Sequence, residues 1–250
     1  MRKIIHSLTL CLAVLLAGPA SAFDIEAMNP DERQAFRDEV RAYLLDNPEV
    51  LVEAIGVLEQ RQADAQATDD ATLIRTNAEA LFEDGHSWVG GNPDGDVTLV
   101  EFLDYACSFC KRAHPEVMEL LESDGNIRFI AKEFPILGPE SEIASRFAIA
   151  VLQTGDDDTY EEVLDRLMTL RGGLSEAAIE RLADEMGLDM AALRARMDSA
   201  EVDAVIDDNR ALAQRLGVNG TPTFVLGERI LRGYLPIEDM RTLVEATRAE

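Results

Sequence analysis

The feature that most constrains this chain is a Cys-x-x-Cys motif, Cys107-Ser108-Phe109-Cys110. It follows an apolar run at residues 97–103, which predicts a buried strand, and it precedes a helical stretch at residues 111–121. The N-terminus of a helix carries unsatisfied N–H groups and partial positive charge, so it stabilises a thiolate on the first cysteine. A strand, this motif and a helix in this order therefore predict a redox-active cysteine pair.

The first 22 residues have the pattern of a secretory signal peptide. Arg2 and Lys3 form a basic region, residues 8–16 are apolar, and residues 20–22 (Ala-Ser-Ala) match a cleavage site. The alternative is a membrane anchor, but the apolar run is shorter than the roughly 20 residues that span a bilayer. We therefore predict cleavage after Ala22 and export of the mature chain.

Only Cys107 and Cys110 remain in the mature chain, because Cys11 lies in the predicted signal peptide. A disulfide that closes so short a loop stabilises the folded state little. The pair is therefore expected to be reactive rather than structural. The signal has a bacterial pattern. It predicts the periplasm, a compartment that permits disulfides.

The mature chain is strongly acidic. The full sequence has 23 Lys and Arg against 48 Asp and Glu, and removal of Arg2 and Lys3 takes the net charge from −25 to −27. This charge opposes binding to nucleic acids and to anionic lipid, and it favours solubility. Lys111 and Arg112 lie beside the motif in this acidic background, where they either raise the local potential or are simply solvated.

Residues 23–70 carry helical signals and no strand pattern. Asn29 is placed as the N-cap of a first helix, because Pro30 and two acids follow it, and Asn47-Pro48-Glu49 repeats the signal. The apolar positions with helical spacing are Phe36, Val40 and Leu44, then Leu51, Ile55 and Leu58. A segment this small cannot bury its apolar faces alone. We predict an oligomerisation segment, with packing on the chain's own main domain as the alternative.

Residues 71–250 predict one α/β domain. A strand, the motif helix and a second strand form a βαβ unit, which is followed by a helical insert and by a hairpin with a closing helix. The expected bounds are strands at 97–103 and 127–134, an insert at about 139–216, strands at 221–226 and 229–231, and a helix at 236–248. Residues 90–96 predict a turn, and residues 60–71 predict a long helix or a flexible connection.

This order, with Thr221-Pro222 at the start of a late strand, resembles the thioredoxin-fold disulfide oxidoreductases of the DsbA family. The resemblance covers about Trp88 to the C-terminus. Residues 43–51 (Tyr-Leu-Leu-Asp-Asn-Pro-Glu-Val-Leu) are similar to the N-terminal helices of the ScsC subgroup, which is associated with copper tolerance and thiol repair. The resemblance implies a thioredoxin fold with an inserted helical domain and an N-terminal helical oligomerisation segment.

The resemblance also assigns roles to four residues around the motif. Cys107 is implied to be the exposed nucleophile, and Cys110 the buried resolving thiol. Pro222 is implied to be cis, with Thr221 before it, and to face the cysteines. A cis bond costs little for an X–Pro pair, and it would present backbone groups to an extended substrate.

Two further positions are implied to take part in proton transfer. Glu101, six residues before Cys107, matches the buried acid of the family. Lys132 lies on the neighbouring predicted strand and could pair with Glu101. The pair would relay a proton to Cys110, or it would be a partly buried ion pair without a chemical role.

The predicted chemistry is thiol–disulfide exchange through a mixed disulfide, in which only the thiolate reacts. A shift of about three units in the pKa of Cys107 would stabilise the reduced form by about 4 kcal/mol, which makes the pair more oxidising by roughly 90 mV. Ser108 and Phe109 replace the His that strong family oxidants carry between their cysteines. This argues against extreme oxidising power. Because the N-terminal helices could also join protomers around a shared cleft, as isomerases usually need, we favour a disulfide isomerase or reductase that acts on secreted proteins.

Two alternatives stay open at this point. One is a DsbA-type dithiol oxidase, and the other is a Cu(I)-binding protein for copper tolerance that uses Cys107 and Cys110, because soft thiolates suit Cu(I). Zinc is disfavoured because only His86 and His114 are left to complete four ligands. No cofactor is predicted. The expected partners are protein thiols and disulfides, a membrane redox partner similar to DsbB, DsbD or ScsB, and further copies of the chain as a dimer or trimer.

Overall fold

The computed structural model describes residues 27–249 of the chain, so the predicted signal peptide at residues 1–22 lies outside the described residues. Contacts divide the chain into two units, Met1–Arg61 and Gln62–Glu250. The division falls inside α3 (Glu49–Thr76), which is one continuous helix through residues 60–71. Among the described residues, no helix is long and apolar enough to cross a membrane.

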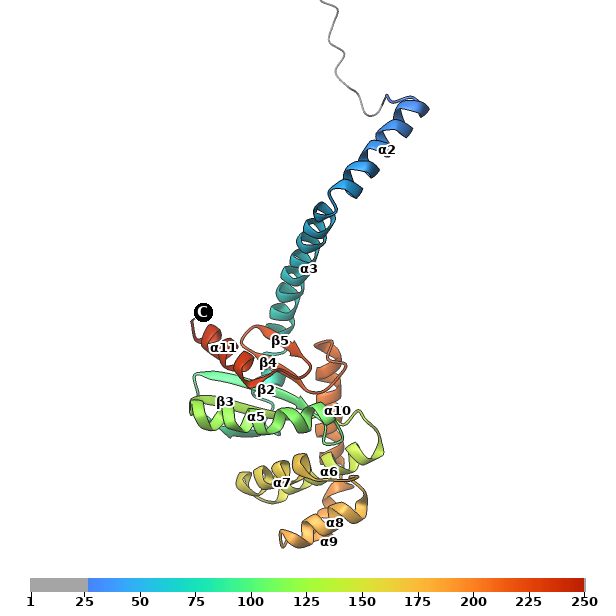
Figure 1. Cartoon of the computed structure of the whole chain (residues 1–250). Coiled ribbons are helices and arrows are strands. Elements are labelled where there is room, and N and C mark those ends of the chain that lie inside the picture. The colour runs from blue at the N-terminus through green and yellow to red at the C-terminus, as the bar shows by residue number, and fades with distance from the viewer. Residues whose placement is uncertain (1–26, 250) are drawn as a thin grey trace, which may run out of the picture. The chain divides into compact units, whose positions relative to one another are not determined.

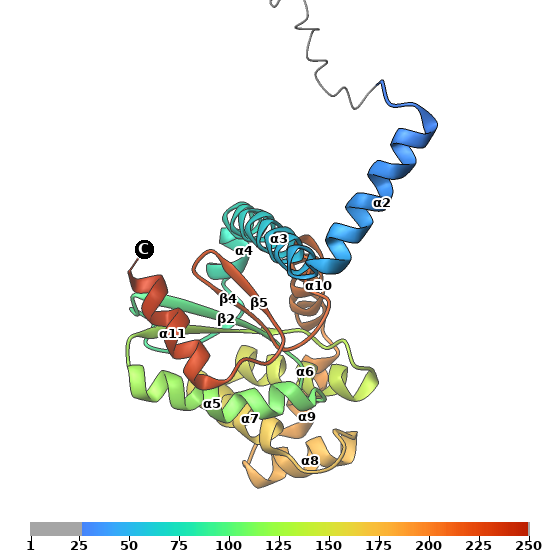
Figure 2. The ribbon, with the colours of Figure 1, turned by 45° about the horizontal axis from the view of Figure 1, so that its top comes forward.

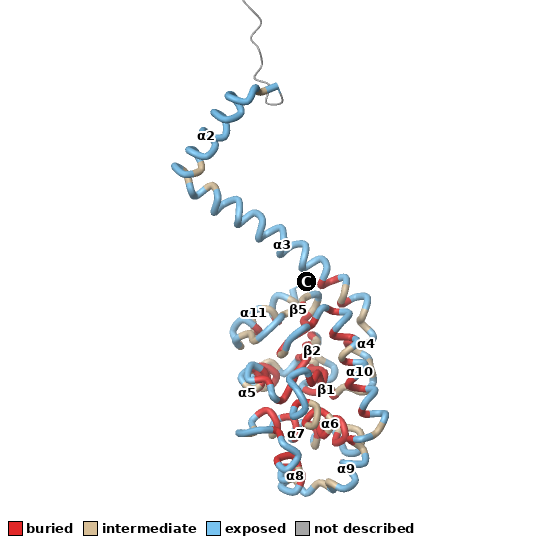
Figure 3. The backbone as a smooth tube through the Cα atoms, turned by 90° about the vertical axis from the view of Figure 1, so that its right-hand side faces the viewer, coloured by how far each residue is buried: buried red, intermediate tan, exposed pale blue. Residues whose placement is uncertain are grey.

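The first unit consists of α2 (Pro30–Asp46) and the first half of α3. Asn29 caps α2 as predicted: its side chain accepts from the backbone of Asp31 and Glu32, and Glu32 closes the capping box. No residue of α2 is buried, as the tube in Figure 3 shows. The apolar residues of these helices that stay exposed are Phe36, Val40, Tyr43, Leu45, Leu51, Val52, Ile55, Val57 and Leu58.

The second unit is built on a five-stranded sheet (Figure 1), with strand order β1-β3-β2-β4-β5. The strands are β1 (Trp88–Gly91), β2 (Val97–Leu103), β3 (Ile127–Glu133), β4 (Thr223–Leu226) and β5 (Arg229–Arg232). β2 and β3 are parallel, because α5 (Ser108–Asp124) crosses between them, and the other pairs are antiparallel. The predicted βαβ unit and hairpin are thus both present.

Strand β1 corrects the sequence prediction, which assigned residues 90–96 to a turn. Gly90 and Gly91 lie inside β1 and pair with Phe129 and Arg128 of β3. A side chain on Gly90 would collide with the indole ring of Trp88, and Gly91 adopts a positive φ of 66°. These glycines therefore permit a close approach within an edge strand rather than marking a loop.

The two faces of the sheet bury two separate clusters of side chains. Alternate residues of β2 point to opposite faces: Leu99 and Leu103 face the first cluster, whereas Val100 and Phe102 face the second. The first face is covered by α5, by α11 (Ile237–Arg248) and by inserted helices, and the second by α4 (Ala78–Phe82) and the C-terminal ends of α3 and α10 (Ala200–Arg215), as Figure 2 shows.

The inserted segment is helical throughout, as its sequence predicts. Its helices are α6 (Pro139–Thr154), α7 (Asp157–Thr169), α8 (Glu176–Glu185), α9 (Met190–Met197) and α10 (Ala200–Arg215). Their apolar stripes join the cluster on the first face of the sheet. The fold is therefore a thioredoxin-type α/β sheet with a helical insertion, preceded by N-terminal helices.

Candidate active site

The cysteine pair lies at the junction of β2 and α5. Cys107 is the N-cap residue of α5, and its backbone is extended, while Cys110 lies in the first turn. The backbone carbonyl of Cys107 accepts from Lys111, and its N–H donates to the carbonyl of Asp104. Both cysteines are free thiols, so the structure describes the reduced form.

The environment of Cys107 favours its thiolate. A hydrogen bond from the Cys110 thiol has the largest effect and, with Thr221 and the backbone N–H groups of Phe109 and Cys110, it lowers the pKa of Cys107 to about 5. Burial acts in the opposite direction. This is the effect expected for a cysteine at a helix N-terminus, so the thiol of Cys107 is ionised at neutral pH.

Cys110 has the opposite character. Its side chain is fully buried, and burial raises its pKa far above the ordinary value, with further upward contributions from Cys107 and Glu101. At neutral pH the pair therefore consists of one thiolate, on Cys107, and one thiol, on Cys110.

The accessibility of Cys107 differs from what the family resemblance implies. Cys107 is only 6% exposed, and in the described reduced form its thiol donates to the backbone oxygen of Thr221, 3.1 Å from Sγ. This bond is lost when the thiol ionises, so it opposes the groups that lower the pKa of Cys107. The neighbouring Phe109 is 55% exposed. The implied exposed nucleophile is therefore a largely covered one, because the loop before β4 closes over its sulfur.

That loop carries the Thr221–Pro222 peptide bond, which is cis as the resemblance implies. The backbone oxygen of Pro222 accepts from the N–H of Gly233, and this bond fixes the loop to the end of β5. A cavity of about 260 Å³ opens here, lined by residues that include Thr221, Pro222 and Arg232. Thr221 thus lies between the reactive sulfur and an open cavity.

Glu101 is a buried acid beneath the cysteines. It lies in the middle of β2, is 3% exposed, and one of its carboxylate oxygens has no hydrogen-bond partner. Burial, followed by the nearby Cys107, raises its pKa to about 8. A carboxyl in this state exchanges a proton near neutral pH.

The predicted pairing of Lys132 with Glu101 is wrong. Glu101 aligns with Ala131 in the parallel register, so Lys132 is one residue out of phase and points to the other face of the sheet. Its Nζ donates to the backbone oxygen of Ala80, 2.8 Å away, and forms an ion pair with Asp84.

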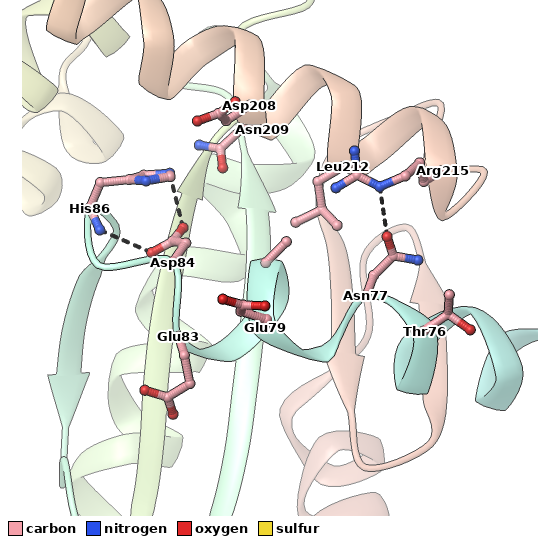
Figure 4. Close-up of a pocket in the computed structure, with 11 residues that line it drawn as sticks. Thr76, Asn77, Glu79, Glu83, Asp84, His86, Asp208, Asn209, Leu212 and Arg215 are labelled. Atoms are coloured by element: carbon pink, nitrogen blue, oxygen red, sulfur yellow. Dashed lines mark hydrogen bonds and ion pairs between the residues drawn. The ribbon is translucent and has the colours of Figure 1, made fainter.

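Asp84 also accepts from His86 and lines a cavity on that second face (Figure 4), where Asn77 and Arg215 form another hydrogen bond. Lys132 is fully buried, and its burial lowers its pKa, while Asp84 opposes that shift. The pair of Lys132 and Asp84 is therefore a structural ion pair that lies across the sheet from the cysteines.

Comparison with known proteins agrees with this geometry. The thioredoxin family model matches residues 83–246, which include both cysteines and the cis proline. The chain belongs to the thioredoxin family. A second model, the N-terminal domain of the copper resistance protein ScsC, matches residues 32–65, so the chain is an ScsC-like member of the DsbA group.

Solved structures of this thioredoxin group cover most of the chain. A thioredoxin-like oxidoreductase from Silicibacter pomeroyi DSS-3 is 41% identical, with a TM-score of 0.65, over 69% of this chain and 98% of that one. ScsC from Proteus mirabilis in a transitional conformation is 29% identical, with a TM-score of 0.66, over 90% of this chain and 99% of that one.

A curated relative of a different kind also matches. The Na(+)/H(+) antiporter NhaA 1 of Salinispora arenicola (strain CNS-205) is 30% identical over 163 residues, which are 64% of this chain and 24% of the antiporter. The chain therefore spans about a quarter of the length of this curated relative.

One site residue of this thioredoxin-family chain was missed by the sequence analysis. Asp104 is fully buried in the turn before the motif. Its Oδ1 accepts from Ala106 N and Ser141 Oγ at 2.8 and 2.7 Å, and its Oδ2 accepts from Ile136 N and Leu137 N at 2.8 and 3.0 Å. Through these bonds Asp104 connects the turn before Cys107 to the loop before α6 and to Ser141 in α6. The available signal was an Asp placed directly after a buried strand.

A copper site was tested against the residues present. Among the described residues, no group of three or more His, Cys, Asp and Glu side chains could hold a metal ion. His114 lies on α5, but its Nε2 is 3.1 Å from Asp165, and burial is the largest effect that lowers its pKa. The cysteine sulfurs described here are those of Cys107 and Cys110, and burial raises the pKa of Cys110 far above its ordinary value. Binding of Cu(I) by Cys107 and Cys110 stays a prediction.

Proposed function

We propose that the mature chain is a periplasmic thiol–disulfide oxidoreductase that acts on secreted proteins as an isomerase or reductase. The observation that carries the proposal is the asymmetry of the cysteine pair: the pKa of Cys107 is lowered to about 5, and the pKa of Cys110 is raised. Stepwise disulfide exchange requires one thiolate that attacks the substrate first and a second thiol that reacts only afterwards.

In the proposed reaction, the thiolate of Cys107 attacks one sulfur of a substrate disulfide. A mixed disulfide forms, and the other substrate sulfur leaves as a thiolate. Cys110 then loses its proton, for which the ionised form of nearby Glu101 is the acceptor, and its sulfur attacks the Sγ of Cys107. Burial raises the pKa of Glu101 to about 8, so only a minority of molecules hold it ionised at neutral pH. The Cys107–Cys110 disulfide forms, the second substrate thiolate leaves, and two electrons have passed to the substrate. In isomerisation, a substrate thiolate attacks the mixed disulfide instead and releases Cys107.

The loop at Thr221 and Pro222 supports binding of an extended substrate. The backbone oxygen of Thr221 is 3.1 Å from the sulfur of Cys107, and a cavity opens beside it. A substrate strand that hydrogen-bonds to the backbone of Thr221 would bring its own cysteine to Cys107. Side-chain recognition is then limited, so we expect many different clients.

The exposed apolar residues of α2 and α3 favour the isomerase or reductase over a DsbA-type oxidase. Val52 is 70% exposed and Leu45 is 65% exposed. No residue of α2 is buried, and the buried residues of α3 are at its C-terminal end. Contiguous apolar exposure of this kind is typical of an association surface. Joined copies would surround one substrate with several cysteine pairs, as an isomerase needs. A DsbD-like or ScsB-like membrane partner would keep Cys107 reduced, whereas an oxidase would need a DsbB-like one.

The test is reactivation of a scrambled-disulfide protein by the full mature chain. Leu45→Asp and Val52→Asp should reduce the oligomer to monomers in sedimentation and abolish reactivation, because charges on the apolar surface oppose association. Gln62→Asp places the same charge at an exposed polar position on α3 and serves as the control. Unchanged reactivation by the monomeric variants would exclude the oligomeric isomerase, and no reactivation by the unaltered chain would leave an oxidase or reductase.

A further inference from the structure

A buried carboxylate that the proposed reaction does not use lies at the end of β3. Glu133 is 3% exposed, and one of its oxygens, Oε1, accepts hydrogen bonds from two tyrosines. The hydroxyl of Tyr105 is 2.6 Å away and the hydroxyl of Tyr160 is 2.7 Å away. Both tyrosine rings are fully buried. Two short O–H···O bonds thus converge on a single atom.

The two tyrosines come from different parts of the fold. Tyr105 lies in the turn between β2 and α5, two residues before Cys107. Tyr160 lies on α7, in the inserted helices, and its ring packs on Trp88 of β1 with 5.3 Å between ring centroids. The carboxylate therefore joins the active-site turn to the insert.

Glu133 has further neighbours at its backbone and at its carboxylate. The backbone oxygen of Glu133 accepts from Asn209 on α10 at 3.1 Å, and Ser145 on α6 lies close to the carboxylate. The second oxygen, Oε2, is buried without a hydrogen-bond partner, and no ion pair with a Lys or Arg is present at this side chain among the described residues. The arrangement rests on hydrogen-bond geometry rather than on a charge pair.

We propose that Glu133 is a positioning residue that couples the inserted helices to the turn presenting Cys107, because Tyr105 and Tyr160 are bonded to the same oxygen. The inference rests on the proposed function of Cys107 as the reactive thiolate. A shift of α7 moves Tyr160, and through Oε1 it changes the position of Tyr105. The N–H groups of Phe109 and Cys110, which stabilise the thiolate, follow that turn directly.

The test measures the pKa of Cys107 by thiolate absorbance in the full mature chain, which needs no turnover. Tyr160→Phe keeps the ring and its packing on Trp88 but removes the bond to Glu133, and it should raise the pKa of Cys107 by about one unit, a tenfold loss of thiolate at acidic pH. Tyr105→Phe should do the same, and the double variant should add little to either change.

A conservative change at Glu133 separates positioning from charge. Glu133→Gln keeps an acceptor oxygen for both tyrosines and should leave the pKa of Cys107 close to that of the unaltered chain. Glu133→Leu removes the acceptor and should raise it as the tyrosine variants do. Burial raises the pKa of Glu133 to about 7, so a positioning role requires little charge on it where Cys107 titrates near 5. A lowered pKa of Cys107 in the Gln variant would mean that Glu133 is charged there and acts through that charge, since a nearby negative charge disfavours a thiolate.

Thr154→Val is the matched control, because it removes from α6 a hydroxyl that bonds only the backbone oxygen of Ala150. Thermal unfolding is measured on every variant, and Tyr160→Phe alone decides the question if Glu133→Leu does not fold. An unchanged pKa of Cys107 in Tyr160→Phe would overturn the coupling. An ordinary pKa of Cys107 in the unaltered chain would instead overturn the proposed function, so the two failures are distinguishable.

Discussion

The two faces of the central sheet bury charged groups in opposite ways. On the first face, Glu101 and Glu133 lie under the cysteines and the inserted helices, and neither has a cationic partner among the residues that the structure describes. On the second face, Lys132 is fully buried and forms an ion pair with Asp84. Burial raises the pKa of Glu101 to about 8 and that of Glu133 to about 7, whereas Asp84 has its pKa lowered well below its ordinary value.

The difference separates groups that can exchange protons from groups that stabilise the fold. A buried carboxylate without a cation has its proton near neutral pH and can take part in chemistry. In a buried ion pair each charge stabilises the other, and removal of one partner is strongly destabilising. Four changes to the chain would test this separation.

Cys107→Ser should abolish disulfide exchange, because an alcohol at this position is not ionised and cannot form a mixed disulfide. Cys110→Ser should keep the nucleophile and accumulate mixed disulfides with substrates, which non-reducing electrophoresis detects. Cys107→Ser should unfold at a lower urea concentration than the reduced protein at pH 7, because it lacks the stabilised thiolate. Residual turnover by Cys107→Ser would show that the thiolate of Cys107 is not the nucleophile.

Asp84→Asn should lower the free energy of unfolding by about 3–5 kcal/mol, because it leaves Lys132 charged, buried and unpaired. Asp84→Asn combined with Lys132→Met should recover most of this loss, since neither charge is then buried. Urea unfolding measures both changes. The thiolate pKa of Cys107 should stay unchanged in the folded variants, and a shift in it would mean that the two faces are not independent.

The stability of the reduced protein should depend on pH through Cys107. The pKa of Cys107 in the folded protein is about 5, below the ordinary 9.0, so the thiolate stabilises the folded state. This stabilisation is complete above about pH 9 and is lost as the pH falls through about 5. At pH 7 this stabilisation amounts to about 3 kcal/mol, which raises the reduction potential by about 60 mV. Urea unfolding of the reduced protein and of reduced Cys107→Ser should show a gap that widens with pH; a constant gap would contradict it.

Glu101→Gln should slow the attack by Cys110 about tenfold, below the hundredfold or more of direct acid–base catalysis, since no hydrogen bond joins Glu101 to either sulfur in the described structure. Release of a preformed mixed disulfide in stopped flow measures this step. Stability should not fall, because the lost carboxylate had an unpaired buried oxygen. Lys132→Met serves as the control on the other face, and an equal slowing there would refute the assignment.

The local signals of the sequence determined the framework of the active site. The apolar run at residues 97–103 is β2 with the predicted bounds, and Cys107 caps the helix that follows. Asn29 caps α2, and the hairpin turn falls at residues 227–228. Each of these features depends on residues within a few positions of one another, so the chemistry of a short segment was sufficient to predict it.

The tertiary structure alone decided which charged groups meet. Glu101 and Lys132 lie on adjacent strands, but a register offset of one residue sends them to opposite faces of the sheet. Tertiary packing likewise brings together Tyr105 and Tyr160, which lie 28 residues before and 27 residues after Glu133 and bond to one of its oxygens. Register and helix packing are set by the whole core, because burial of all its apolar side chains selects them together, and no short segment contains that information.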